Sequence, residues 1–130
     1  DLSKLGLFRQ KSKFIKKTAA IIIDRYKGQI PKTMEALTSL PGVGRKTANI
    51  ILGNVYSIVD GIAVDTHVTR LSKLFGLTKN KNPEKIEKDL MQILPREEWF
   101  DFTNRVIAYG RTYCKSSCKH TTCPLKQYIE

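Results

Sequence analysis

Residues 40–48 read Leu-Pro-Gly-Val-Gly-Arg-Lys-Thr-Ala, and this stretch decides the fold more clearly than any other. Two glycines flank one aliphatic residue between two segments with helical spacing, which predicts a tight turn joining two helices. The backbone N–H groups of such a turn have no helical partner, and the second helix adds the positive end of its dipole. A phosphate oxygen, directly or through a bound cation, fits this arrangement. The stretch therefore predicts a helical hairpin that binds a backbone phosphate.

The two glycines of the turn give its backbone a freedom that residues with a Cβ lack. We expect Gly42 and Gly44 to allow positive φ and close approach of the phosphate, with Val43 packing back into the domain. A phosphate contact positions DNA without reading its sequence. The alternative is an ordinary corner, in which Pro41 and the glycines only reverse the chain. A lone Pro-Gly-x-Gly favours the corner, whereas the full run favours the phosphate-binding hairpin.

Apolar residues recur at three- and four-residue spacing along most of the chain, which predicts helices. Residues 57–63 alternate between apolar residues and Asp or Gly, which suggests a loop or one extended stretch that resembles a strand. Turn and capping residues separate the helices. The expected helices cover residues 10–26, 31–40, 45–55, 66–75, 83–94 and 99–110. In the third helix we expect a buried stripe made of Ala48, Ile51, Leu52 and Val55. The fold class is therefore all-α.

At 130 residues the chain is long enough for one domain with a hydrophobic core. We expect a single helical domain over residues 1–130, with a hairpin-bearing part (1–58), helices that follow Asp65 (59–113) and a cysteine-rich segment (114–130). No window approaches the roughly 20 apolar residues that span a bilayer, and the start lacks the build of a secretion signal. We therefore expect an intracellular protein with no membrane partner.

The charge balance is strongly basic, since 23 Lys and Arg against 12 Asp and Glu leave a net charge of +11. Neutralised phosphates release condensed counterions, so this surplus favours nucleic acid over acidic small molecules as the partner. The alternative is a basic surface that serves only solubility. Charge alone leaves both interpretations open.

The run at 40–48 resembles the helix-hairpin-helix of the endonuclease III family, the base-excision glycosylases that also cut at abasic sites. The likeness extends through Ala63-Val-Asp-Thr-His-Val68 and Gly110-Arg-Thr-Tyr-Cys114, and more weakly to Leu5-Gly-Leu-Phe8. It implies a helix-hairpin-helix DNA-glycosylase fold acting on double-stranded DNA with damaged bases, chiefly oxidised pyrimidines, or abasic sites. The residues implied to contact DNA are Leu40, Pro41, Gly42, Val43, Gly44, Arg45 and Thr47.

By this resemblance Lys46 is the nucleophile. An amine just inside a helix N-terminus meets positive dipole charge, which favours the neutral form that attacks. The alternative role for Lys46 is one more phosphate contact, as we expect of Arg45. Asp65 matches the family's catalytic carboxylate, which stabilises positive charge on the sugar or helps to activate the amine. A helix N-cap is the other role of Asp65, compatible with the first.

The implied reaction begins when the damaged nucleotide is flipped out of the duplex. Lys46 attacks its C1′, the base departs, a Schiff base forms, and β-elimination nicks the strand. Lys46 and Asp65 should then share one pocket, whereas His67 is interpreted as a packing residue. A bifunctional glycosylase and abasic-site lyase is expected, because relatives that only remove a base carry other residues at the position of Lys46.

Three other functions stay open. The chain could be a non-catalytic helix-hairpin-helix DNA-binding fragment, a purely structural helical domain, or a mismatch-specific adenine or thymine glycosylase, which Lys46 disfavours. Family members are monomers that carry several helices before the point where this chain begins. We expect those N-terminal helices to be absent here, which would expose apolar faces and favour self-association.

Three cysteines lie within residues 114–123, an odd, local group that argues for a metal site and against a disulfide scaffold. Relatives hold a [4Fe–4S] cluster with four cysteines separated by six, two and five residues. Cys114 and Cys123 match the first and third ligands, but Cys118 falls three residues too early for the second. Counted from Cys123, His120 stands at the second position and Ile129 at the fourth. A cluster, a zinc ion on Cys114, Cys118, Cys123 and His120, or unliganded cysteines are the alternatives.

Overall fold

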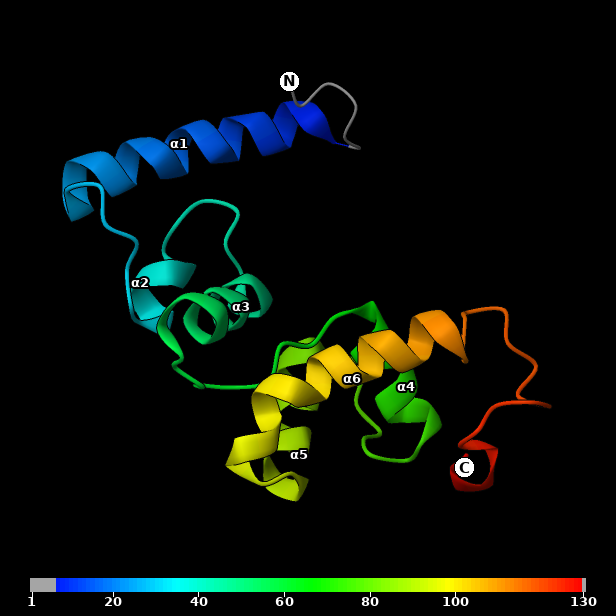
Figure 1. Ribbon diagram of the computed structural model, residues 1–130. Coiled ribbons are helices and arrows are strands. Elements are labelled where there is room, and N and C mark those ends of the chain that lie inside the picture. Colours follow the sequence, from blue (N-terminus) through cyan, green and yellow to red (C-terminus); the bar gives the residue numbers. More distant parts are fainter. Residues whose placement is uncertain (1–6, 130) are drawn as a thin grey trace. The chain divides into compact units, whose positions relative to one another are not determined.

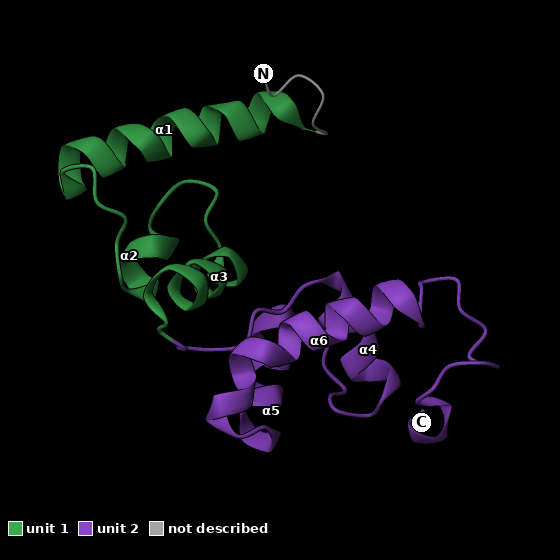
Figure 2. Ribbon diagram, in the orientation of Figure 1, with its two compact units in different colours: residues 1–58 green, residues 59–130 purple. Residues whose placement is uncertain are grey.

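The computed structural model describes residues 7–129, so Leu5 and Gly6 of the weaker resemblance lie outside the described residues. The chain divides into two compact units, residues 1–58 and 59–130 (Figure 2). The α-helices in Figure 1 are α1 (Phe8–Tyr26), α2 (Met34–Thr38), α3 (Arg45–Tyr56), α4 (Thr66–Leu74), α5 (Pro83–Ile93) and α6 (Trp99–Thr112). Two 3₁₀ turns, η1 (Arg96–Glu98) and η2 (Lys126–Tyr128), complete the order. The six expected helices and the absence of strands are confirmed over residues 7–129.

In the first unit, short-range signals set the helix ends. Gly28 follows the end of α1, has φ +81° and donates its N–H to the carbonyl of Ile22 at 2.9 Å. Thr33 caps α2, accepting the N–H of Ala36 at 3.2 Å. The core that joins the three helices consists of Leu37, Leu40, Ala48 and Leu52, with Ile22 and Tyr26 of α1 packed against it.

The apolar faces of the first unit are only partly covered. None of the side chains of α1 is buried, and Ile15 and Ile23 are 54% and 64% exposed. In α3, Ala48 and Leu52 are buried as expected, but Val55 is 57% exposed. The prediction of a fully buried stripe was therefore wrong at Val55. Helix α2 has five residues, so within this unit it covers only part of the length of α3.

In the second unit, α4 packs against α5 and α6. Asn82 caps α5 by accepting the N–H groups of Glu84 and Lys85, with Pro83 at the first helical position, an order typical of a helix start. The larger core consists of Ile62, Val64, Val68, Ile86 and Leu90. A second core contains Leu71, Cys114 and Cys123, with Phe75 and Tyr109 packed against it, and this core attaches the cysteine-rich segment to α4 and α6. None of the helices among residues 7–129 combines the length and the hydropathy needed to cross a bilayer.

Candidate functional site

The hairpin turn between α2 and α3 is built around one glycine. Gly42 has φ +78°, a value that residues with a Cβ rarely adopt, and Val43 donates its N–H to the carbonyl of Leu40 at 3.1 Å. Val43 is half-buried against the core of the first unit, as expected. Gly44, however, has φ −96° and ψ 175°, which is extended backbone open to any residue. The expectation of positive φ is confirmed for Gly42 and wrong for Gly44.

Helix α1 braces this turn through two side chains that the sequence analysis did not identify. The hydroxyl of Thr18 donates to the carbonyl of Pro41 at 2.8 Å. The ring of Phe14 lies directly against Gly42, because a Cβ at Gly42 would come within 2.8 Å of the Phe14 Cδ2 atom. Residues 14 and 18 share one helical face, which the spacing shows, but the spacing does not show what that face contacts.

The N-terminus of α3 faces outward with its first-turn side chains. Gly44 provides no side-chain cap, and Ala48 donates its N–H to the carbonyl of Gly44 at 2.9 Å. Arg45, Lys46 and Thr47 are all exposed. An uncapped helix start with two cationic side chains is an arrangement that attracts an anion.

Asp65 begins α4 as its N-cap, accepting the N–H of Val68 at 2.8 Å. The capping role expected of Asp65 is therefore confirmed, and the bond holds the half-buried carboxylate in one orientation. Lys46 belongs to the first unit and Asp65 to the second, and the shared pocket expected for the two side chains stays a prediction. His67, two residues further on, packs against Gly110 of α6, where a Cβ would lie 2.5 Å from its Nδ1 atom.

A basic hollow of about 540 Å³ lies beside the start of α4. Its cationic lining comes from Arg70 of α4, Arg111 of α6 and Lys115. Arg70 and Arg111 could not be identified as neighbours from the sequence, because their helices are far apart in it and only packing brings the two guanidinium groups to one hollow. This hollow adds a cluster of positive charge beside the helix that Asp65 caps.

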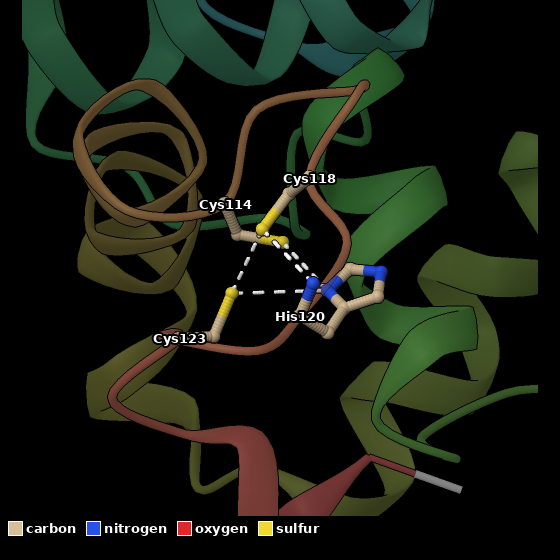
Figure 3. Close-up of side chains that lie close together, drawn as sticks. All are labelled: Cys114, Cys118, His120 and Cys123. Carbon is tan, nitrogen blue, oxygen red and sulfur yellow. Dashed lines mark hydrogen bonds between the residues drawn. The ribbon is translucent and has the colours of Figure 1, made fainter.

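Cys114, Cys118, His120 and Cys123 converge on one point, as Figure 3 shows. Their four donor atoms all lie within 4.8 Å of one another. The His120 Nδ1 atom is 3.6 Å from the Cys114 Sγ and 3.7 Å from the Cys123 Sγ, and the Sγ atoms of Cys118 and Cys123 are 3.1 Å apart. Cys114 and Cys123 are buried, and the other two are half-buried. The structure thus brings together the four residues proposed as ligands from the sequence, and this group could bind a metal.

Hydrogen bonds polarise the thiols of this group. The Cys123 thiol and the backbone N–H of His120 bond to the Cys118 sulfur, which lowers the pKa of Cys118. Donating to that sulfur, together with burial, raises the pKa of Cys123 to about 11. The Arg70 guanidinium donates to the Cys114 sulfur at 3.5 Å and also to the Cys114 carbonyl. Arg70 therefore links α4 directly to the four-residue group.

A family model and the relatives with similar sequences all indicate the same protein family. The family model described as HhH-GPD superfamily base excision DNA repair protein matches residues 1–96. Endonuclease III of Synechocystis sp. is 45% identical over 109 residues, covering 84% of this chain and 50% of the relative. Endonuclease III of Bacillus subtilis is 42% identical over 127 residues, covering 96% of this chain and 58% of the relative.

Solved structures show the same similarity in three dimensions. A trapped covalent intermediate of endonuclease III with DNA matches with a TM-score of 0.90 at 41% identity, covering 97% of this chain and 60% of that one. A thermostable thymine-DNA glycosylase matches with a TM-score of 0.81 at 20% identity, covering 98% of this chain and 61% of that one, which shows a shared fold alone. The chain thus spans between half and about 60% of the length of these two relatives and two structures.

Proposed function

Because the chain belongs to the HhH-GPD superfamily of base excision DNA repair proteins, we propose that it removes a damaged base from duplex DNA and then cuts the strand at the abasic site. One observation carries this proposal: Lys46, an exposed amine, is the second residue of α3, directly after the glycine turn. A solved structure similar to this chain is a trapped covalent intermediate of endonuclease III with DNA. A nucleophile on the hairpin helix would account for such a bond in this chain.

Binding to DNA would rest on backbone amides and cations. The turn residues Leu40 to Gly44, with Arg45 and Thr47, would hold one phosphate at the start of α3. The net charge of +11 and the basic hollow beside α4 would add attraction that depends on salt but not on sequence. Duplex DNA with an oxidised pyrimidine or an abasic site is the proposed substrate. Such a role would place the protein with the DNA inside the cell.

The proposed chemistry uses two side chains. The Lys46 amine attacks C1′ of the flipped nucleotide and displaces the base, and opening of the C1′–O4′ bond then gives a protonated Schiff base. The Schiff base acidifies C2′, and loss of a C2′ proton expels the 3′ phosphate, which breaks the strand. Asp65 would stabilise the positive charge that develops on the sugar or accept a proton from the attacking amine. The N-cap bond to Val68 supports this role, because it fixes the carboxylate in one orientation.

A metal on the four-residue group would have a structural role. Arg70 of α4, the helix that Asp65 caps, donates hydrogen bonds to Cys114. A metal that fixes Cys114 would therefore help to hold α4 and the neighbouring Lys115 in place. None of the proposed catalytic steps uses this group.

Borohydride trapping tests the nucleophile. The parent chain and a Lys46→Ala variant are incubated with an abasic duplex and reduced, which makes a Schiff base permanent. Lys88→Ala, a change of an exposed lysine on α5, is the matched control. We expect the parent and the control to cross-link and Lys46→Ala to lose the cross-link. Cross-linking of Lys46→Ala as strong as that of the parent would refute the assignment.

Non-catalytic DNA binding is the second candidate function, because the uncapped start of α3 with the exposed Arg45 and Lys46 would bind a phosphate without any chemical step. This candidate predicts salt-sensitive binding to duplex DNA by the parent chain, with neither cross-linking nor strand cleavage. Binding assays on intact, abasic and thymine-glycol duplexes, run beside the trapping assay, separate the two functions. The same panel of lesions identifies the preferred base.

A further inference from the structure

The four-residue group differs in chemistry from the iron–sulfur site that the family resemblance implies. Its donors are three thiols and one imidazole, contributed by Cys114, Cys118, Cys123 and His120. Three cysteines with one histidine are among the donor sets of structural zinc sites. We propose that this group holds a single tetrahedral Zn²⁺ ion in place of a [4Fe–4S] cluster.

The donor separations support a single ion. For Zn–S bonds near 2.3 Å and Zn–N bonds near 2.0 Å, tetrahedral geometry puts two sulfurs roughly 3.8 Å apart and a sulfur and a nitrogen roughly 3.5 Å apart. The two observed sulfur–nitrogen distances are 3.6 and 3.7 Å. The Sγ atoms of Cys118 and Cys123, at 3.1 Å, would need to separate by roughly 0.7 Å, a change within the reach of side-chain rotation.

The same separations do not fit a [4Fe–4S] cluster. Each thiolate of such a cluster binds a different iron, so the iron–iron edge adds to the distance between ligand sulfurs. Four donor atoms that all lie within 4.8 Å of one another leave no room for four irons and four sulfides. Ile129, at the position expected for a fourth cysteine, also has no donor atom.

The surroundings of the group suit a thiolate-bound cation. Three thiolates on Zn²⁺ leave one net negative charge, and the Arg70 guanidinium donates to the Cys114 sulfur at 3.5 Å. The backbone N–H of His120 donates to the Cys118 sulfur at 3.4 Å. His120 has φ +60°, a left-handed conformation unusual for a residue with a Cβ, and this conformation accompanies the approach of its Nδ1 to two sulfurs.

A zinc ion would change what the group contributes to the protein. Zn²⁺ has no redox chemistry, so the ion would stabilise the cysteine-rich segment without transferring electrons. The ion would hold together a segment that has one short 3₁₀ turn between Cys114 and Ile129. This inference goes beyond the proposed function, and its test does not depend on whether the chain cleaves DNA.

The first experiment is metal and sulfide analysis of the full chain, purified without oxygen from cells supplied with both iron and zinc. We expect one zinc per chain, with neither iron nor acid-labile sulfide. Equal amounts of iron and acid-labile sulfide, as in a [4Fe–4S] cluster, together with absorbance at about 400 nm would overturn the proposal. Protein that contains neither metal and binds no added zinc would overturn it as well.

The second experiment excludes accidental loading during production. Metal-free chain is treated separately with iron plus sulfide and with Co²⁺, a spectroscopic substitute for zinc. We expect no cluster to form, and we expect Co²⁺ to show the intense visible bands of a tetrahedral site with thiolate ligands. Assembly of a stable cluster, or a Co²⁺ spectrum without thiolate bands, would contradict a mononuclear site.

A ligand variant completes the test. Loss of an outer partner of a metal ligand costs about 10- to 100-fold in affinity, so His120→Ala should weaken zinc binding by at least about tenfold. Lys119→Ala, a change at the exposed neighbouring residue, is the matched control and should bind zinc as the parent does. Equal zinc affinity of His120→Ala and Lys119→Ala would remove His120 from the site and refute the proposed ligand set.

Discussion

Replacement of Gly110 by alanine tests how α6 positions α4, the helix that Asp65 caps. Gly110 is buried, and a Cβ there would lie 2.5 Å from the His67 Nδ1 and 3.2 Å from the Leu71 Cδ1. Both contacted side chains belong to α4. The added methyl group must therefore displace the His67 ring or push the two helices apart.

The expected cost follows from two opposing terms. Forcing a methylene-sized group into a packed site costs about 1–3 kcal/mol, and the 2.5 Å contact places Gly110→Ala in the upper part of this range. Alanine is better than glycine inside a helix by roughly 0.8–1.0 kcal/mol. We therefore expect Gly110→Ala to lower the free energy of unfolding by about 1–2 kcal/mol.

Urea and thermal unfolding of the full chain measure this change in two backgrounds. In the parent, the loss should appear as a fall in Tm of about 4–8 °C per kcal/mol for a unit of this size. In a His67→Ala background the ring is gone, so Gly110→Ala should become neutral or stabilising by up to about 1 kcal/mol. The change of sign corresponds to a coupling energy of about 2 kcal/mol between the two positions.

Two outcomes would refute this reasoning. An equal loss of stability in both backgrounds would mean that the methyl group meets something other than His67. No loss in the parent would mean that α4 and α6 can move apart at little cost. In each background the effect of Gly110→Ala is measured against the same chain with Gly110, because His67→Ala changes the stability by itself.

Three further measurements test other parts of the chain. Gly42→Ala should lower the Tm more than Gly28→Ala, although both glycines have positive φ. A Cβ at Gly42 would lie 2.8 Å from the Phe14 ring, whereas a Cβ at Gly28 meets nothing within 4 Å. Equal falls in Tm would contradict the contact between α1 and the hairpin turn. Asp65→Ala should lose about 1 kcal/mol of stability with its cap, as measured by urea unfolding, whereas Asp65→Asn should keep most of it; equal losses would argue against the cap. Hydrogen bonds from Thr78 and Asn80 lower the pKa of Asp89 from its usual 3.8. The ionised Asp89 carboxylate therefore contributes its full stabilisation above about pH 4, and this stabilisation is lost as the pH falls through the lowered pKa. Asp89→Asn should flatten the acid limb of a plot of unfolding free energy against pH, and an unchanged limb would contradict this role.

The sequence alone was sufficient for the features that depend on neighbours three or four residues apart. The six helices, the cap that Asn82 provides, the cap that Asp65 provides and the turn at Gly42 all arise from such local interactions. The motif at residues 40–48 also identified the family, because its residue types and their order are specific. The four residues of the candidate metal site could also be predicted, because Cys114, Cys118, His120 and Cys123 lie within ten residues of one another in the sequence.

Packing decided the rest, because it depends on which distant faces meet. The bond from Thr18 to Pro41, the contact of His67 with Gly110 and the bond from Arg70 to Cys114 each join residues far apart in the sequence. Periodicity predicts which face of a helix is apolar but not which residues pack against it, so the exposure of Val55 could not be predicted. The spacing of the cysteines left a cluster and a zinc ion open, and the distances between donor atoms, which only the folded chain has, favour the single ion.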